Sequence, residues 1–236
     1  MNLYASIAQR KSCRKYDLAP LPAETLVKID AAIREFTPLY PDVPLTWRFV
    51  KKVTGRFHVE APHYLIVSGV GKAGELESAG FLFEQLALWL DAMELGCIWL
   101  GASKDAELGA LPDDLIVLGF GKTTEPVHRS PAEFKRKPFE KITNAPQNPC
   151  LQAVQLAPSG MNLQPWYFAQ EGERVLVYRQ KLKPHLSLLY KLTELDIGIA
   201  LCHYALACRE FGKPFHFTRS EALPELAGYF PFGVIA

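Results

Sequence analysis

Residues 157–166 read A-P-S-G-M-N-L-Q-P-W, and the rest of the chain can be interpreted outward from them. A short apolar run typical of a helix, residues 150–156, precedes this stretch, and a strand-like W-Y-F-A-Q begins at its last residue. Two prolines fix the path of the backbone, Gly160 allows a ligand to approach it closely, and the Asn162 amide both donates and accepts hydrogen bonds. The stretch predicts a rigid polar turn suited to a flat, hydrogen-bonding molecule. An ordinary helix-to-strand connection is the alternative, because turn residues of this kind are common.

The composition indicates a cytoplasmic, water-soluble protein. The chain has 236 residues, of which 49% are hydrophobic and 22% charged, enough for one large or two small domains. A net charge of +1 gives no sign of a nucleic acid or a membrane surface as partner, and no apolar run reaches the ~18 residues that a membrane span requires. Five irregularly spaced cysteines argue against a disulfide framework, and the first ten residues lack the features of a signal peptide.

The hydrophobic pattern predicts helices and strands in both halves of the chain. Helices are expected over residues 2–9, 22–36, 76–95, 150–156 and 193–211, and strands over 45–53, 63–68, 115–120, 166–170 and 174–179. The two longest helices are apolar nearly all round, which indicates that they are buried in a core. The final 25 residues contain three prolines and are expected to form an irregular tail that packs back.

Parts of the second half resemble parts of the first. The segment P-L-T-W-R-F-V around Trp47 resembles L-Q-P-W-Y-F-A around Trp166, and D-A-M-E-L-G ending at Gly96 resembles A-C-R-E-F-G ending at Gly212. The two tryptophan segments are each preceded by a helix and a proline-containing turn, and each is followed by a strand and a long buried helix. We therefore expect one domain, residues 1–236, made of two related halves at about 1–140 and 141–236.

A basic cluster near the N-terminus is a candidate anion site. Arg10, Lys11, Arg14 and Lys15 place four cations within six residues, with the Ser12 hydroxyl among them. Arginine and lysine pair readily with phosphate oxygens. A solvated basic loop is the alternative, because charge runs are usually exposed.

Taken together, these motifs resemble those of the nitroreductase family of flavin mononucleotide (FMN) enzymes. The family's R-R-S-x-R-x-[FY] signature is matched by Arg10, Lys11, Ser12, Arg14 and Tyr16, with lysine in place of the second arginine. Its A-P-S-x-x-N-x-Q-P-W motif is matched at residues 157–166. Its W-[IL]-G motif is matched by Trp99, Leu100 and Gly101, with Gly96 three positions before the tryptophan, and its R-[RK]-P motif by Arg136, Lys137 and Pro138. The four motifs follow the family's order and cover most of the chain.

The resemblance implies an α+β fold, a three-layer α/β sandwich with a central mixed or antiparallel sheet and long buried helices. Family members are usually homodimers that bind each flavin between subunits. Here the first half holds the basic, W-L-G and R-K-P motifs, and the second half holds A-P-S-G-M-N. We therefore expect the two halves to imitate a dimer, to bind one FMN between them, and to allow a monomer.

The resemblance also implies roles for single residues. Arg10, Lys11, Arg14 and Arg136 would hold the phosphate and ribityl end with Ser12 nearby, Pro158, Ser159, Gly160 and Asn162 would lie along the ring, and backbone N–H groups around Leu100 and Gly101 would reach its N5 and O4. No catalytic side chain and no metal is expected.

The implied function is an FMN-dependent oxidoreductase with tightly bound FMN. It would take hydride from NAD(P)H and pass it to a nitroaromatic, a quinone or a similar small acceptor, with no nucleic acid or membrane as partner. A non-catalytic FMN-binding protein, a flavin store or sensor, is the alternative.

Two further patterns are weaker. Residues 69–74 spell G-x-G-x-x-G, but a dinucleotide site needs an acidic residue about 20 positions later at the end of a strand, where Asp91 lies in a predicted helix. Cys202, His203 and Cys208 share a predicted helix without sharing one face, which favours core positions over metal ligands.

Overall fold

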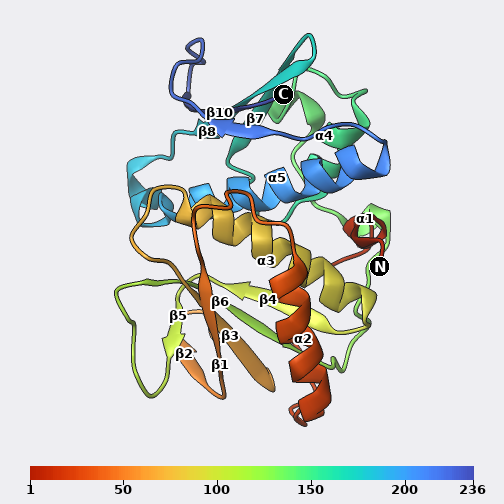
Figure 1. Cartoon of the computed structure of the whole chain (residues 1–236), viewed down its shortest axis with the longest axis vertical. Coiled ribbons are helices and arrows are strands. Elements are labelled where there is room, and N and C mark those ends of the chain that lie inside the picture. The colour runs from red at the N-terminus through yellow and green to blue at the C-terminus, as the bar shows by residue number, and fades with distance from the viewer.

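Two antiparallel sheets lie on either side of a pair of long helices (Figure 1). The structure is a computed structural model that describes the backbone of residues 1–236 and every side chain except those of residues 187 and 188. The helices of the middle layer are α3 (Glu75–Ala92) and α5 (Leu192–Glu210), which pack against each other. The predicted α+β class is confirmed, but in place of the expected central sheet the helices lie in the centre and two antiparallel sheets flank them.

The first sheet belongs to the first half of the chain. Its strand order is β1 (Thr46–Val50), β3 (His63–Ser68), β6 (Asp114–Gly121) and β4 (Gly96–Leu100), all antiparallel. Leu65 and Val67 of β3 pack in the core around α3, whereas Tyr64 and Ile66 pack in a second cluster on the opposite face. Burial on both faces explains why β3 reads as a continuous apolar run.

The strand predicted over residues 45–53 is broken in two. β1 ends at Val50, and Val53 begins the short strand β2 (Val53–Gly55), which pairs with β5 (Ser103–Asp105) in a separate two-stranded sheet. The exposed residues between them form the bend.

The second sheet corrects the prediction for the C-terminus. Its strand order is β7 (Trp166–Glu171), β8 (Arg174–Gln180), β10 (Tyr229–Ile235) and β9 (Phe217–Arg219). The expected irregular tail is therefore wrong, since β9 and β10 complete this sheet. Pro231 is tolerated in β10 because the pairing with β8 shifts register between Pro231 and Gly233, and β9 pairs only with the residues from Gly233 onward.

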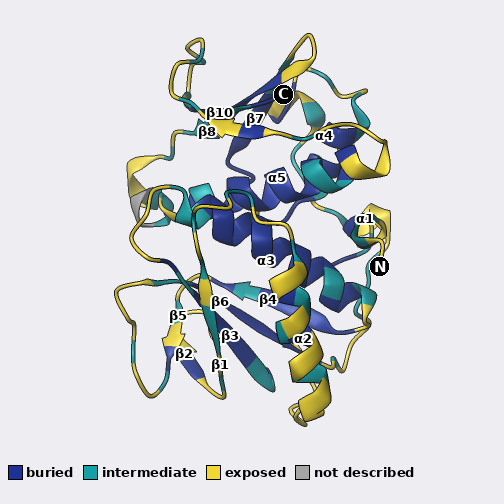
Figure 2. Ribbon diagram, viewed as in Figure 1, coloured by how far each residue is buried: buried dark blue, intermediate teal, exposed yellow. Residues whose placement is uncertain are grey.

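The remaining helices follow local sequence signals. They are α1 (Leu3–Ile7), α2 (Ala23–Glu35) and α4 (Pro149–Leu156), with short 3₁₀ helices η1 (Pro131–Glu133), η2 (Phe139–Lys141), η3 (Gly160–Asn162) and η4 (Pro184–Leu189). The side chain of Asn148 caps α4 by accepting from Cys150 N at 2.9 Å, and Pro149 occupies the first helical position. Figure 2 shows α3 and α5 buried between the sheets and the outer face of α2 exposed. No helix within the described part of the chain is long and apolar enough to cross a lipid bilayer.

The two halves share an order of elements and a symmetric helix contact. Apart from β2 and β5, each sheet arranges its strands in the order first, second, fourth, third, with the long helix following the second strand. A Cβ atom added to Gly80 would lie 2.0 Å from Leu195 O, and one added to Gly198 would lie 2.0 Å from Glu77 O. Each glycine thus contacts the residue three positions before the other glycine, which lets the backbones of α3 and α5 touch.

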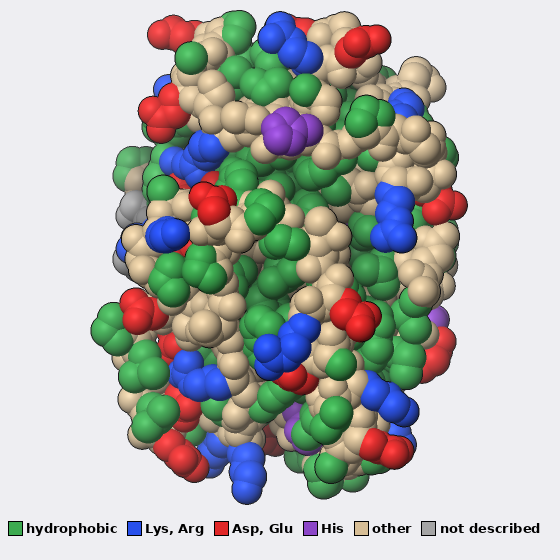
Figure 3. All heavy atoms as spheres, in the orientation of Figure 1, with side chains coloured by type: hydrophobic (Ala, Val, Ile, Leu, Met, Phe, Trp, Pro, Cys, Tyr) green, Lys and Arg blue, Asp and Glu red, His purple; other side chains and the backbone are tan. Residues whose placement is uncertain are grey.

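Figure 3 shows acidic and basic side chains interspersed over the viewed face, in keeping with the small net charge. This face therefore gives no sign of a single-sign field for a large polyanion.

Candidate functional site

Two adjoining cavities lie between segments of the first and second halves. A cavity of about 410 Å³, here called the cationic cavity, is lined by Arg10, Lys11, Ser12, Arg14, Arg129, Glu133, Lys135, Arg136, Pro158, Ser159, Met161 and Asn162. A cavity of about 140 Å³, here called the apolar cavity, is lined by Ser12, Arg14, Ile98, Trp99, Gly101, Ile116, Pro158, Ser159, Gly160, Met161, Leu192, Leu195, Asp196 and Ile199. Their shared lining joins the loop after α1 to the turn after α4. The motifs that the sequence analysis singled out therefore meet at one place.

The cationic cavity contains a buried arginine with unused hydrogen-bond donors. Arg10 is 3% exposed, and its Nε lies 3.5 Å from Glu84 Oε1. Its Nη1 and Nη2 atoms are buried and have no hydrogen-bond partner within the described structure. Leaving a buried charged donor unsatisfied costs free energy. Because Arg10 is among the residues that line the cavity, an anion bound there would compensate this buried charge, and the residues present fit a phosphate group.

Like charges crowd the same cavity. Burial lowers the pKa of Arg129 to about 10, with a further contribution from Arg10. Burial also lowers the pKa of Arg136 to about 10, assisted by Arg129 and Arg10. A bound anion would reverse this repulsion, because an opposite charge favours the charged form of each guanidinium.

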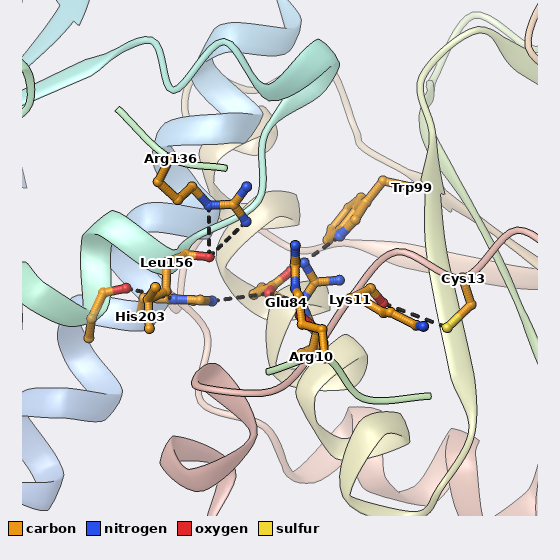
Figure 4. Close-up of polar contacts among 10 residues, drawn as sticks. Arg10, Lys11, Cys13, Glu84, Trp99, Arg136, Leu156 and His203 are labelled. Atoms are coloured by element: carbon orange, nitrogen blue, oxygen red, sulfur yellow. Dashed lines mark hydrogen bonds and ion pairs between the residues drawn. The ribbon is translucent and has the colours of Figure 1, made fainter. Parts of the chain in front are cut away.

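Asn162 lies at the cationic cavity with its amide engaged by the protein. Its Oδ1 accepts from Arg136 Nη1 at 2.7 Å, and its Nδ2 donates to Lys135 O at 2.6 Å. Arg136 also donates from Nη2 to Leu156 O at 2.9 Å (Figure 4). In this arrangement Asn162 orients the Arg136 guanidinium, and contact with a ring edge would require breaking these bonds.

A buried carboxylate ties the two cavities together. Glu84 on α3 accepts from Trp99 Nε1 at 3.2 Å and contacts His203 Nε2 at 3.1 Å, while Arg10 approaches it from the loop (Figure 4). His203 Nδ1 lies 3.0 Å from Ala153 O, and because a carbonyl oxygen only accepts, Nδ1 carries a proton. Glu84 thereby fixes a wall of the apolar cavity and the arginine of the cationic cavity at once.

The edge of β4 presents peptide groups toward the site. Cys97 O accepts from Cys13 N at 3.1 Å on the free edge of this strand. Successive peptide groups of a strand face opposite edges, so the Trp99 peptide faces the same free edge and the Leu100 peptide faces β6. The Leu100 side chain packs in the second cluster on the far face, whereas Gly101 lines the apolar cavity.

The turn of residues 157–166 is tightly braced. Met161, Asn162 and Gln164 adopt left-handed backbone angles, with φ of 51°, 57° and 43°. Ser159 Oγ accepts from Gln164 N at 2.8 Å, and Gly160 N donates to Asp196 Oδ1 at 2.9 Å. Such φ values cost non-glycine residues free energy, and they commonly mark binding sites.

Sequence reasoning missed several residues of the site, among them Arg129, Glu84 and Asp196. Arg129 lies in a polar segment that matches no motif, Glu84 lies within a helix read as apolar, and Asp196 lies on the buried helix α5. The signal available for Glu84 and Asp196 was an acidic residue inside an otherwise apolar helical run, since such residues are rarely buried without a role.

The weaker patterns do not form sites. In the G-x-G-x-x-G loop, Glu75 Oε2 accepts from the backbone nitrogens of Val70, Gly71 and Lys72 at 3.1, 2.9 and 3.2 Å, which occupies the donors that a phosphate would need. His203 is buried and bonded as described above. Among the described residues, no group of three or more potential metal ligands is found.

The structure is thus an α+β sandwich with a cationic cavity beside an apolar one, and comparisons with known proteins identify its class as the nitroreductase fold. Residues 2–208 match the family described as "Putative TM nitroreductase", and the chain belongs to this family. A crystal structure described as a "putative nitroreductase" from Thermotoga maritima MSB8 superposes with a TM-score of 0.72 at 20% identity, covering 100% of this chain and 93% of that one.

More distant structures share part of the chain. A nitroreductase family protein from Clostridium difficile 630 covers 60% of this chain and 96% of its own, at 16% identity and a TM-score of 0.47. The NADPH:FMN oxidoreductase from Vibrio harveyi covers 56% of this chain and 73% of its own, at 13% identity and a TM-score of 0.41. A search of curated proteins found no significant match.

Proposed function

We propose that this protein is an FMN-dependent oxidoreductase of the nitroreductase type. The observation that carries the proposal is the buried Arg10, whose two free nitrogens lie at a cationic cavity that adjoins an apolar one. FMN has a dianionic phosphate at one end, which suits the cationic cavity, and a flat ring at the other, which suits the apolar cavity. Bound FMN would supply hydride chemistry at N5, with NAD(P)H as donor and a nitroaromatic, quinone or similar small molecule as acceptor.

The chain's residues take roles according to the cavity they line. The buried Arg10 and the half-buried Arg129 and Arg136 neutralise the phosphate, while Lys11 and the exposed Arg14 add charge at the rim. Ser12, Pro158, Ser159 and Gly160 line the path between phosphate and ring, and the Trp99 and Gly101 peptides offer N–H donors to the ring edge. These are positions and charges, so no side chain is needed as a nucleophile.

We further propose that the two halves, residues 1–140 and 141–236, imitate a dimer within one domain and bind one FMN. A rotation that superposes α3 on α5 and Gly80 on Gly198 would bring Phe81 to the place of Ile199 and Glu77 to the place of Leu195. Leu195 and Ile199 line the apolar cavity, so a second, equivalent cavity would lie beside Phe81 and Glu77. At that second position Phe215 stacks on Phe81 with ring centroids 5.9 Å apart, and Arg219 bonds Glu77. The protein's own side chains therefore fill the second position.

Flavin titration and anaerobic reduction test this function. Purified protein should bind one FMN per chain, behave as a monomer in light scattering, lose its visible flavin bands with NADH or NADPH, and regain them with a quinone. Two FMN per chain would refute the imitation of a dimer. Bands that persist with both nicotinamides would favour the flavin store or sensor, and a protein that refuses FMN would overturn the proposal.

The proposed location is the cytoplasm. All five cysteines are buried free thiols, including Cys150 and Cys208, whose sulfur atoms lie 3.7 Å apart. Neighbouring thiols of this kind persist in a reducing compartment.

A further inference from the structure

Asp196 is a buried carboxyl group in the wall of the apolar cavity. It lies on α5 and is 3% exposed. Its Oδ1 accepts from Gly160 N at 2.9 Å, and its Oδ2 accepts no hydrogen bond from the described side chains or backbone. A Cβ atom added to Gly160 would lie 3.6 Å from Oδ2, so the glycine keeps the space beside this oxygen open. One oxygen is thus fixed and the other is left for a ligand.

Among the side chains that the structure describes, none forms an ion pair with this carboxyl group, and burial and the Gly160 N–H are the causes of its altered pKa. Burial raises the pKa of Asp196 to about 7, partly offset by the Gly160 N–H. Arg14 is the other ionisable side chain among the described residues that line the apolar cavity. The ionisable groups on neighbouring elements are bonded to one another: Glu77 with Arg219, Glu84 with His203, and Arg179 with Glu194. Asp196 is therefore about half protonated near pH 7 and mostly protonated below it.

We propose that Asp196 is the proton donor for the acceptor that is reduced in this cavity. This role rests on the function proposed above. Reduction of a quinone to a hydroquinone needs two electrons and two protons. Hydride from the reduced cofactor brings both electrons and one proton. The Asp196 O–H bond breaks to supply the second proton, the O–H bond of the hydroquinone forms, and water then reprotonates the carboxylate.

The other groups at the cavity are poorly suited to this transfer. The Arg14 guanidinium does not release its proton near neutral pH. The Ser159 hydroxyl already accepts from Gln164 N, and a hydroxyl proton is far less acidic than a carboxyl proton. Glu84 and His203 do not line the cavity and are bonded to each other. An acid that titrates near the working pH gives the most effective general catalysis.

The test compares Asp196→Asn with wild type, using one acceptor that needs a proton and one that does not. Asparagine keeps an oxygen for Gly160 N but carries no acidic proton. Reduced holoenzyme is mixed with 1,4-benzoquinone or with ferricyanide in stopped flow, across about pH 5 to 9. We expect wild-type reoxidation by the quinone to slow as the pH rises through neutrality. Asp196→Asn should be about 10²-fold slower at low pH and lose this dependence, while ferricyanide rates stay within about twofold.

Glu194→Gln is the matched control, because Glu194 is a carboxylate on the same helix that bonds Arg179 outside the apolar cavity. It should keep the wild-type pH profile. Infrared spectra of the apoprotein give a second readout, in which a protonated carboxyl band that titrates near neutrality should be missing from Asp196→Asn and present in Glu194→Gln.

Several outcomes would overturn the role of Asp196. They are an unchanged quinone profile in Asp196→Asn, an equal loss with ferricyanide, or a carboxyl band that survives the substitution. A wild-type protein that binds no FMN would instead overturn the proposed function, and the role of Asp196 with it. The two failures are therefore distinguishable in the wild type alone.

Discussion

Gly198→Ala probes the contact on which the two halves meet. The added Cβ atom would lie 2.0 Å from Glu77 O, whereas such a contact is essentially never shorter than 3.0 Å, so α3 and α5 must separate by roughly 1 Å. A gap of this size forfeits about a quarter to a half of the dispersion energy of the atoms that face it. Over-packing of this kind costs about 3 kcal/mol, at the upper end of the usual range because the atom that the new Cβ meets belongs to the backbone and cannot rotate away.

Whether Gly198→Ala raises or lowers the free energy of unfolding shows whether the two helices are in contact at this residue. At an open helical position, alanine is more stabilising than glycine by about 1 kcal/mol. Ala31→Gly on the exposed face of α2 provides that reference, and it should lower the free energy of unfolding by about this amount. Gly198→Ala should destabilise despite its better helix propensity, lowering the melting temperature by about 6–12 °C.

Urea and thermal unfolding of the apoprotein, followed by circular dichroism, measure both variants and Gly80→Ala. Both glycines lie at the same contact between α3 and α5. Once the first alanine has separated the helices, the second should therefore lower the free energy of unfolding by less than it does alone. A Gly198→Ala protein as stable as wild type would refute the close crossing. Full additivity in the double variant would refute the idea that the two glycines serve the same contact.

Three further predictions follow from the site. Arg136→Ala should weaken FMN binding by about 2–5 kcal/mol and riboflavin binding far less, because riboflavin has no phosphate. Arg14→Ala should weaken FMN binding by about 1 kcal/mol or less, because Arg14 is exposed. Equal losses of FMN and riboflavin affinity, measured by calorimetry, would contradict the phosphate role of Arg136. Glu84→Gln should lower the unfolding free energy by about 3–5 kcal/mol, because it leaves the buried Arg10 charge without its carboxylate; unchanged urea midpoints would count against this. Because the folded pKa of Asp196 is raised to about 7, its contribution to stability is full at pH values below the usual aspartate pKa and declines as the pH rises to about 7, by on the order of 4 kcal/mol. The unfolding free energy of Asp196→Asn should not show this decline with pH. If the unfolding free energies of wild type and variant change with pH in parallel, the raised pKa of Asp196 is excluded.

The main elements of the fold could be predicted because their patterns are local. The strand over residues 63–68 and the helices over 76–95 and 193–211 are recognised by apolar runs of characteristic length. The C-terminal strands could not be recognised, since Pro231 argues against a strand unless its bulge and its neighbour are known.

The sequence could indicate the parts of the candidate site that lie in continuous motifs. It could not indicate the parts that come together only when the chain folds. The basic cluster and the 157–166 turn are continuous in sequence, so both could be singled out from the sequence as candidate site segments. Glu84, Arg129 and Asp196 matter because of what they contact, and those contacts join residues far apart in the chain. Similarly, the sequence could not show that the amide of Asn162 is occupied by Arg136.

Both walls of the candidate site belong to one covalent chain: the loop after α1 and β4 on one side, and the 157–166 turn and α5 on the other. Formation of the site is therefore a unimolecular event, and dilution does not take its walls apart as it does in an obligate dimer. The apparent FMN affinity should stay constant from micromolar to nanomolar protein. A substitution in either wall also alters one cavity alone, so each half is free to change without duplicating the change elsewhere.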